Sequence, residues 1–121
     1  MIKLKRRIYT DEEIKILKQN IFIEDVLYKR QLVYDPVFKI WTIFMRLERP
    51  ELTAREIFER AGINTIILHR DLPQKRIKQW LDNYKKFGIK YFIPIDESYT
   101  ISDNFKKKLL DIILERMNDY D

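Results

Sequence analysis

Apolar residues recur at helical spacing in several segments of the chain, and most of these segments begin at a capping sequence. Thr10 and Glu13 have the spacing of a capping box, which predicts a first helix that ends near Asn20. Asp35 and Pro36 suit the N-cap and the first position of a second helix, which stretch 48–51 ends. The apolar stripe of this second helix comprises Val37, Ile40, Trp41, Phe44 and Leu47. We expect it to be the core helix, with Trp41 as a core residue rather than a platform for stacking bases.

Two other segments are rich in β-branched and aromatic residues, as strands are. Strands are predicted at Val26–Tyr28 and Leu32–Tyr34, joined by a turn over 29–31 that contains neither Gly nor Asn. Short extended pieces are also predicted over 90–94 and 99–101. Ser102 or Asp103 would then cap a final helix that runs to about residue 118, with an apolar stripe of Phe105, Leu109, Ile112, Ile113 and Met117.

The stretch Thr53–Gly88 has the pattern of a helix-turn-helix unit with one additional helix. Thr53–Glu56 is a second capping box and opens a short helix. A second short helix is predicted over 65–70, with Asn64 as its cap. A longer helix is predicted over 74–87, after a proline, and its apolar face comprises Ile77, Trp80, Leu81 and Tyr84.

Three positions in this stretch meet the requirements of a helix-turn-helix. Gly62 tolerates positive φ in the turn, and Ile63 and Leu68 are apolar where the two helices must lock together. Phe58 stands where a small residue is usual, so we expect a wider helix crossing or contact with another helix. The predicted fold is therefore mainly α, a helix-turn-helix bundle with one or two short β-hairpins.

The length and composition of the chain indicate a small domain without disulfides or membrane spans. A chain of 121 residues, 45% of them hydrophobic, can form one domain with a sizeable core. The absence of Cys excludes a disulfide framework, and a single His makes a zinc site a poor expectation. No apolar run approaches the roughly 18 residues of a membrane span, and the basic N-terminus lacks the apolar segment of a signal peptide. We expect a cytoplasmic, bacterial protein with a basic arm over 1–9, a helix-turn-helix domain over 10–88 and a hairpin-plus-helix extension over 89–121.

The net charge of +5 is unevenly distributed. Residues 69–90 carry seven basic and two acidic side chains, and residues 1–9 carry four basic and no acidic ones. Such patches suit contact with phosphates, although a solvated helix face has the same composition. Asn and Arg suit bidentate contacts with bases, so we expect segment 64–70 to read bases and the next helix chiefly to hold phosphates. The candidate DNA-binding residues are Asn64, Thr65, His69, Arg70, Gln74, Lys75, Arg76, Lys78, Gln79, Lys85 and Lys86.

Enzyme signatures are lacking in the sequence. Its 19 Asp and Glu residues show no spacing that singles out a catalytic pair or a metal-binding set. The phosphate-binding loop, the nucleophile elbow and the H-E-x-x-H motif do not occur. Ser98 and Ser102 have no histidine nearby in sequence to activate them. We expect no catalytic residue, no metal and no cofactor.

Four features stand out together within residues 7–88: Tyr9-Thr10 with Glu13, Tyr34 with Phe38-Lys39, the run AREIFERAGI at 54–63, and Arg76 with Trp80. In these features the chain resembles the small helix-turn-helix proteins that the first reading frame of bacterial insertion sequences encodes. The resemblance implies recognition of the element's terminal repeats, while catalysis resides in a separate integrase-like transposase. Two parts depart from the pattern. Stretch 89–121 does not look like a leucine-zipper tail, and 69–73 replaces a more basic, Gly-containing linker.

The leading prediction is sequence-preferring binding of double-stranded DNA by a transposase-like protein without catalytic activity of its own. One alternative is a protein-interaction module whose basic face is merely solvated, and another is a domesticated transcriptional regulator. The expected partners are double-stranded DNA, a catalytic transposase and a second copy of the chain, with no membrane.

Overall fold

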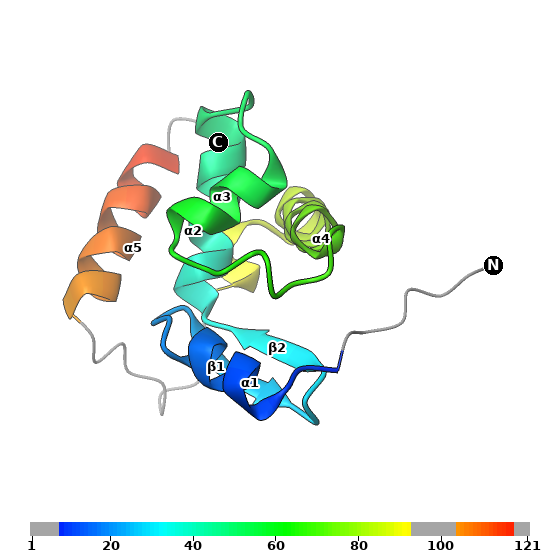
Figure 1. The fold of residues 1–121 in the computed structure, drawn as a ribbon. Helices are drawn as coiled ribbons and strands as arrows, with labels where there is room; N and C mark the ends of the chain where they lie inside the picture. Colours follow the sequence, from blue (N-terminus) through cyan, green and yellow to red (C-terminus); the bar gives the residue numbers. More distant parts are fainter. Residues whose placement is uncertain (1–7, 93–103, 118–121) are drawn as a thin grey trace.

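The computed structural model describes residues 8–92 and 104–117, and these residues form helices and one antiparallel hairpin (Figure 1). In chain order the elements are α1 (Asp11–Lys18), β1 (Ile23–Leu27), β2 (Gln31–Tyr34), α2 (Pro36–Glu48), α3 (Ala54–Arg60), α4 (Leu72–Phe87), the 3₁₀ turn η1 (Ile89–Tyr91) and α5 (Asn104–Met117). The predicted mainly α class is confirmed, with one two-stranded sheet among the described residues.

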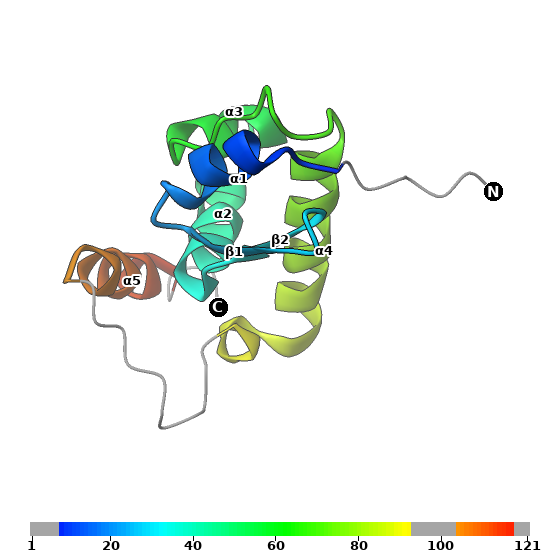
Figure 2. The same cartoon turned by 60° about the horizontal axis from the view of Figure 1, so that its bottom comes forward.

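Helix α2 is the centre of the fold, as the sequence predicts. It lies between α4 and α5 and also contacts α3, and both ribbon views show this order (Figures 1 and 2). Asp35 begins the helix by accepting a 2.8 Å hydrogen bond from the Val37 N–H. Phe38, Ile40 and Ile43 are almost fully buried because neighbours cover α2 on several sides. Trp41 stacks on Phe38 with 6.0 Å between ring centroids, so it belongs to the core as expected.

The hairpin forms in the predicted stretch, but β1 covers Ile23–Leu27 rather than Val26–Tyr28, so Tyr28 lies in the turn. Tyr28 and Lys29 both have positive φ, at 53° and 57°, although neither is Gly or Asn. The turn is closed by the Arg30 N–H, which donates to the Leu27 carbonyl at 2.9 Å. Tyr9 is buried, and its N–H donates to the Lys29 carbonyl at 2.8 Å. Tyr9, which the prediction placed in the arm over 1–9, therefore belongs to the core.

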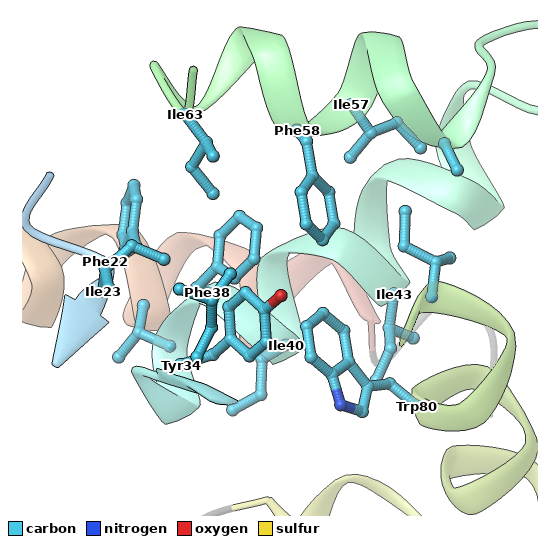
Figure 3. Close-up of a cluster of buried hydrophobic side chains, with 14 of the residues drawn as sticks. Phe22, Ile23, Tyr34, Phe38, Ile40, Ile43, Ile57, Phe58, Ile63 and Trp80 are labelled. Carbon is cyan, nitrogen blue, oxygen red and sulfur yellow. The ribbon is translucent and has the colours of Figure 1, made fainter. Parts of the chain in front are cut away.

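Aromatic side chains from four elements meet where α2, α3, α4 and β2 converge (Figure 3). Phe58 of α3 is completely buried and packs edge-on against Phe38 of α2, with ring centroids 5.1 Å apart. Its other neighbours are Trp80 of α4, in a stacked arrangement at 6.4 Å, and Tyr34 of β2. The bulky residue in the small-residue position thus contacts other elements, as predicted, and sets the spacing between α3 and α4.

The predicted helix over 65–70 is wrong. Residues 61–71 form turns instead, closed by short-range bonds from the Ile67 N–H to the Asn64 carbonyl and from the Leu68 N–H to the Thr65 carbonyl. Three β-branched residues in a row, 65–67, disfavour a helix because their χ1 rotation is restricted there. The Thr65 side chain also forms bonds to α3, which fixes it in the turn. Helix α4 begins earlier than predicted, at Leu72, with Pro73 in its first turn.

The final helix is confirmed, but the segment after α4 and the buried face of α5 differ from the prediction. The sequence predicts an extended piece over 90–94, but residues 89–91 form the 3₁₀ turn η1 directly after Gly88, which ends α4. Residues 93 and 94 lie outside the described residues. In α5, Leu110 and Ile113 are buried against the shared core, whereas Ile112, predicted to face inward, is 57% exposed. Positions 110 and 113 lie on the face of α5 that packs against α2. The extended piece at 99–101 and the capping residues 102–103 lie outside the described residues.

Candidate nucleic-acid interface

Helix α4 presents a long polar face to solvent. The helix has 16 residues, so it is about 24 Å long. Ile77 and Trp80 bury its inner face against the core. The exposed residues between Gln74 and Lys86 are Gln74, Lys75, Lys78, Gln79, Asp82, Lys85 and Lys86. The helix therefore combines a fixed inner face with an outer face that holds four lysines, two glutamines and one acidic residue.

The lysines of this face differ in what they contact. Lys78 pairs with Asp82 at 3.2 Å between Nζ and Oδ2, and both side chains are largely exposed. Such exposed pairs contribute little and are readily exchanged for another anion. Among residues 8–92 and 104–117, no carboxylate lies within ion-pair distance of Lys75 or Lys85. These two ammonium groups are available for a ligand without breaking an existing pair.

Arg76 is placed differently from its neighbours. It is half-buried on the side of α4 that meets the hairpin and α2, and its Nη1 donates to Gln79 Oε1 at 3.1 Å. Burial raises the pKa of the Tyr34 hydroxyl, and the nearby Arg76 guanidinium opposes that change. Lys39 of α2 has its Nζ 5.9 Å from the Trp80 ring centre, and burial lowers its pKa. Arg76 thus contributes to packing at the hairpin, which the sequence prediction of a phosphate contact did not anticipate.

The turn segment 64–70 holds four of the predicted site residues, and the structure separates them. Thr65 is buried, accepts from Arg55 Nε at 3.2 Å and donates to Glu59 Oε1 at 2.9 Å, so it is a structural residue rather than a base-reading one. Asn64 is exposed, and its Oδ1 accepts from the Ile66 N–H at 3.1 Å.

The other two predicted residues stand immediately before α4. His69 is half-buried, and its Nδ1 accepts from the Asp71 N–H at 3.1 Å. Arg70 has an 86% exposed side chain, with only a 3.8 Å contact to Asp71. In the segment predicted to read bases, only Asn64 and Arg70 of the four candidate residues are exposed. Most of the exposed candidate residues lie on α4.

Two arginines beside this surface were not predicted. Arg46, in the last turn of α2, and Arg55, in the first turn of α3, line a hollow together with Arg70 and Gln74. Arg46 and Arg55 are nine positions apart and Arg55 and Arg70 are fifteen apart, so no local pattern could have grouped the three arginines. Only the packing of α2, α3 and α4 brings them together.

The end of α3 is held by Asn20, which follows α1 in the chain. Asn20 Nδ2 donates to the Ala61 carbonyl at 2.9 Å, and its Oδ1 accepts from the Phe22 N–H at 2.9 Å. Gly62 follows with φ of 83°, as the sequence predicts. These bonds tie the end of α3 to the N-terminal part of the fold, and the Phe58 ring, stacked on Trp80, connects α3 to α4.

The described residues contain no cluster of three or more His, Asp or Glu side chains that could hold a metal ion. Within the same residues, no helix is both long enough and apolar enough to cross a lipid bilayer. No protein-family model, no curated protein and no solved structure matches the chain. The functional proposal therefore rests on the geometry and charge of the surface.

Proposed function

We propose that the chain binds double-stranded DNA, with the exposed face of α4 placed in the major groove. The observation that carries the proposal is that face itself, about 24 Å of helix with lysines and glutamines outward and an aromatic core behind it. The major groove admits an α-helix, and glutamine can bond the edge of adenine in two places. Lysines on the same face suit the phosphates along the groove.

The residues that we assign to bases and to phosphates differ from those that the sequence suggests. Gln74 and Gln79, both exposed on α4, are assigned to base edges, and Lys75, Lys78, Lys85 and Lys86 to phosphates. Asn64 and Arg70 are assigned to the DNA backbone at the start of α4, and His69 to support of the turn. A transposase-like role without catalysis, at the ends of a mobile element, remains the proposed biological setting, with a domesticated regulator as the alternative.

A salt titration of duplex binding tests the proposal. The affinity of the wild-type chain for a mixed-sequence duplex is expected to fall linearly on a log–log plot against salt. Lys75→Ala should reduce the slope by about 0.9, because one phosphate contact is lost, and should weaken all sequences alike. Lys108→Ala, an exposed lysine on α5 on the other side of α2, is the matched control and should leave the slope unchanged.

Sequence preference is measured separately by selection from random duplexes. Gln79→Ala should flatten the preference at one position, at a cost of about 1–3 kcal/mol of discrimination. Absence of duplex binding at low salt, or affinity that is independent of salt, contradicts DNA binding and favours a protein-interaction module. Three exposed apolar side chains would then be its first candidates: Ile66, Phe87 and Tyr91.

A further inference from the structure

A hollow at the N-terminal end of α4 is not explained by the helix face alone. It lies where the last turn of α2 and the first turns of α3 and α4 meet, and its volume is about 330 Å³. Arg46, Arg55 and Arg70 each contribute to its wall, and Gln74 stands at its edge on α4. No Asp or Glu is among the described residues that line it. Three guanidinium groups around one small hollow repel one another unless an anion lies between them.

Two of the three arginines are already held in place by the protein. Arg46 Nη1 donates to the Leu52 carbonyl at 2.7 Å, and Arg55 Nε donates to Thr65 Oγ1 at 3.2 Å. A guanidinium has five N–H donors, so these bonds leave others free for a ligand. Little side-chain entropy remains to be lost when such a group binds an anion, because its position is already fixed.

The carboxylates nearest to these arginines compensate them only in part. Glu59 lies 3.4 Å from Arg55 Nε, and about half of each side chain is exposed. Asp71 lies 3.8 Å from Arg70 Nε, at the limit of an ion pair. Exposed pairs of this kind contribute little. Arg46 has no carboxylate within ion-pair distance among the residues that the structure describes.

The backbone of α4 adds a donor at the same place. In the first turn, the Leu72 N–H donates to the His69 carbonyl and the Lys75 N–H to the Asp71 carbonyl, while Pro73 has no N–H. The Gln74 N–H has no acceptor within the described part of the chain. Asp71, at the N-cap, makes no side-chain cap bond. The start of a 16-residue helix therefore offers a free N–H and the positive end of its dipole.

We infer that this hollow binds one phosphate group of the DNA backbone and so fixes the position of α4 along the groove. The inference rests on the proposed function and deepens it, since it adds Arg46 and Arg55 to the interface. Arginine forks suit phosphate oxygens, which accept two parallel N–H bonds. Lys75 follows Gln74 on the exposed face, so a phosphate held here continues into the row of lysines.

Two variants test the site in duplex binding. Arg70→Ala removes the most exposed arginine and should reduce the salt slope by about 0.9, with equal weakening for all sequences. Arg46→Met keeps the length of the side chain and should have the same effect. Lys108→Ala serves as the control with an unchanged slope. Circular dichroism establishes that each variant is folded. Because Arg70 already belongs to the proposed interface, Arg46→Met decides the role of the hollow, and Arg55→Met takes its place if Arg46→Met does not fold.

A second arm separates the two sources of phosphate. The ¹⁵N-labelled wild-type chain is titrated with inorganic phosphate at constant ionic strength, and the Gln74 amide signal is followed. A shift with phosphate that Arg70→Ala abolishes, together with the reduced slope in duplex binding, supports the inference. A shift with an unchanged duplex slope shows a site for free phosphate and overturns the assignment to DNA.

The experiments distinguish a chain whose hollow does not bind a DNA phosphate from a chain that does not bind DNA at all. If the wild-type chain binds duplex with the expected salt dependence while Arg46→Met keeps the wild-type slope, the hollow is not a phosphate site and the proposed function stands. If the wild-type chain does not bind duplex, both the proposed function and the backbone assignment fail, and the phosphate titration alone reports on the hollow.

Discussion

Replacing Phe58 with alanine should remove the contact that holds α3, α4 and α2 in register. The ring is completely buried, and it contacts Phe38, Trp80 and Tyr34 at centroid distances of 5.1, 6.4 and 6.0 Å. A buried Phe→Ala change costs about 3–5 kcal/mol, from lost burial and from the cavity left behind. A domain of this size is stable by about 5–15 kcal/mol, so the loss is a large fraction of the total.

Urea denaturation followed by circular dichroism measures this loss directly. Phe87→Ala is the matched control, because Phe87 is the same residue type at the end of α4 but is 55% exposed. Its substitution removes a ring stacked on Tyr91 at 5.1 Å between centroids and should lower the free energy of unfolding by no more than about 1.5 kcal/mol. Phe58→Leu keeps most of the volume and should cost about 1.5 kcal/mol or less, which keeps the test open if Phe58→Ala does not fold.

The refuting result is a loss for Phe58→Ala that is no larger than the loss for Phe87→Ala, since the buried ring would then contribute no more than an exposed one. Such a result would mean that α3 and α4 are held by other contacts. It would also remove the reason to regard α4 as a rigid platform. A loss in the expected range, accompanied by weaker duplex binding, would connect the core to the exposed face.

The remaining predictions concern backbone conformation. Gly62→Ala should destabilise the fold by about 2 kcal/mol or more, because φ of 83° is left-handed and a Cβ would lie 3.3 Å from Asn20 Nδ2. Gly88 has φ of 79°, and nothing lies within 4 Å of a Cβ added there, so Gly88→Ala should show only the conformational cost and lose less stability than Gly62→Ala. Equal losses of stability in thermal unfolding would contradict a role for the contact with Asn20. Tyr28→Gly should stabilise the fold by roughly 0.5–1 kcal/mol, because it relieves a left-handed residue, whereas Lys15→Gly in α1 should destabilise it by about 1 kcal/mol. Loss of stability in Tyr28→Gly would show that the exposed ring has a contact of its own.

Local signals in the sequence predicted much of the fold. The two capping boxes at Thr10 and Thr53 both form, each with its reciprocal pair of bonds, because side chain and backbone donors lie within one turn of each other. Gly62 takes the predicted conformation for the same reason, since only local sterics decide it. Elements whose signals are local in this sense were found with nearly correct bounds.

The turn over 61–71 was mispredicted because its structure depends on contacts distant in sequence. Thr65 bonds to Arg55 and Glu59 on α3, and Asn20, which follows α1, bonds to the Ala61 carbonyl. None of these three partners can be read from the segment itself. The capping residue, Asn64, was found, but it caps a turn instead of a helix.

The candidate site was predicted in composition but not in arrangement. The basic character of residues 74–86 and the outward lysines of α4 followed from the apolar period of Ile77, Trp80 and Tyr84. The inward placement of Arg76, beside Tyr34 and Lys39, depends on how the hairpin packs against α4. The hollow lined by Arg46, Arg55 and Arg70 likewise exists only after three helices have met.

Amide chemical-shift mapping with a short duplex tests the central claim most directly. The ¹⁵N-labelled chain is titrated with the duplex at low salt, and the shifted amides are placed on the structure. The account predicts that the largest changes lie on the exposed face of α4, from Gln74 to Lys86, and at Arg70, while Lys108 and its neighbours on α5 are unchanged. Absence of shifts, or shifts centred on α5, would contradict the assignment of α4 as the DNA-binding helix.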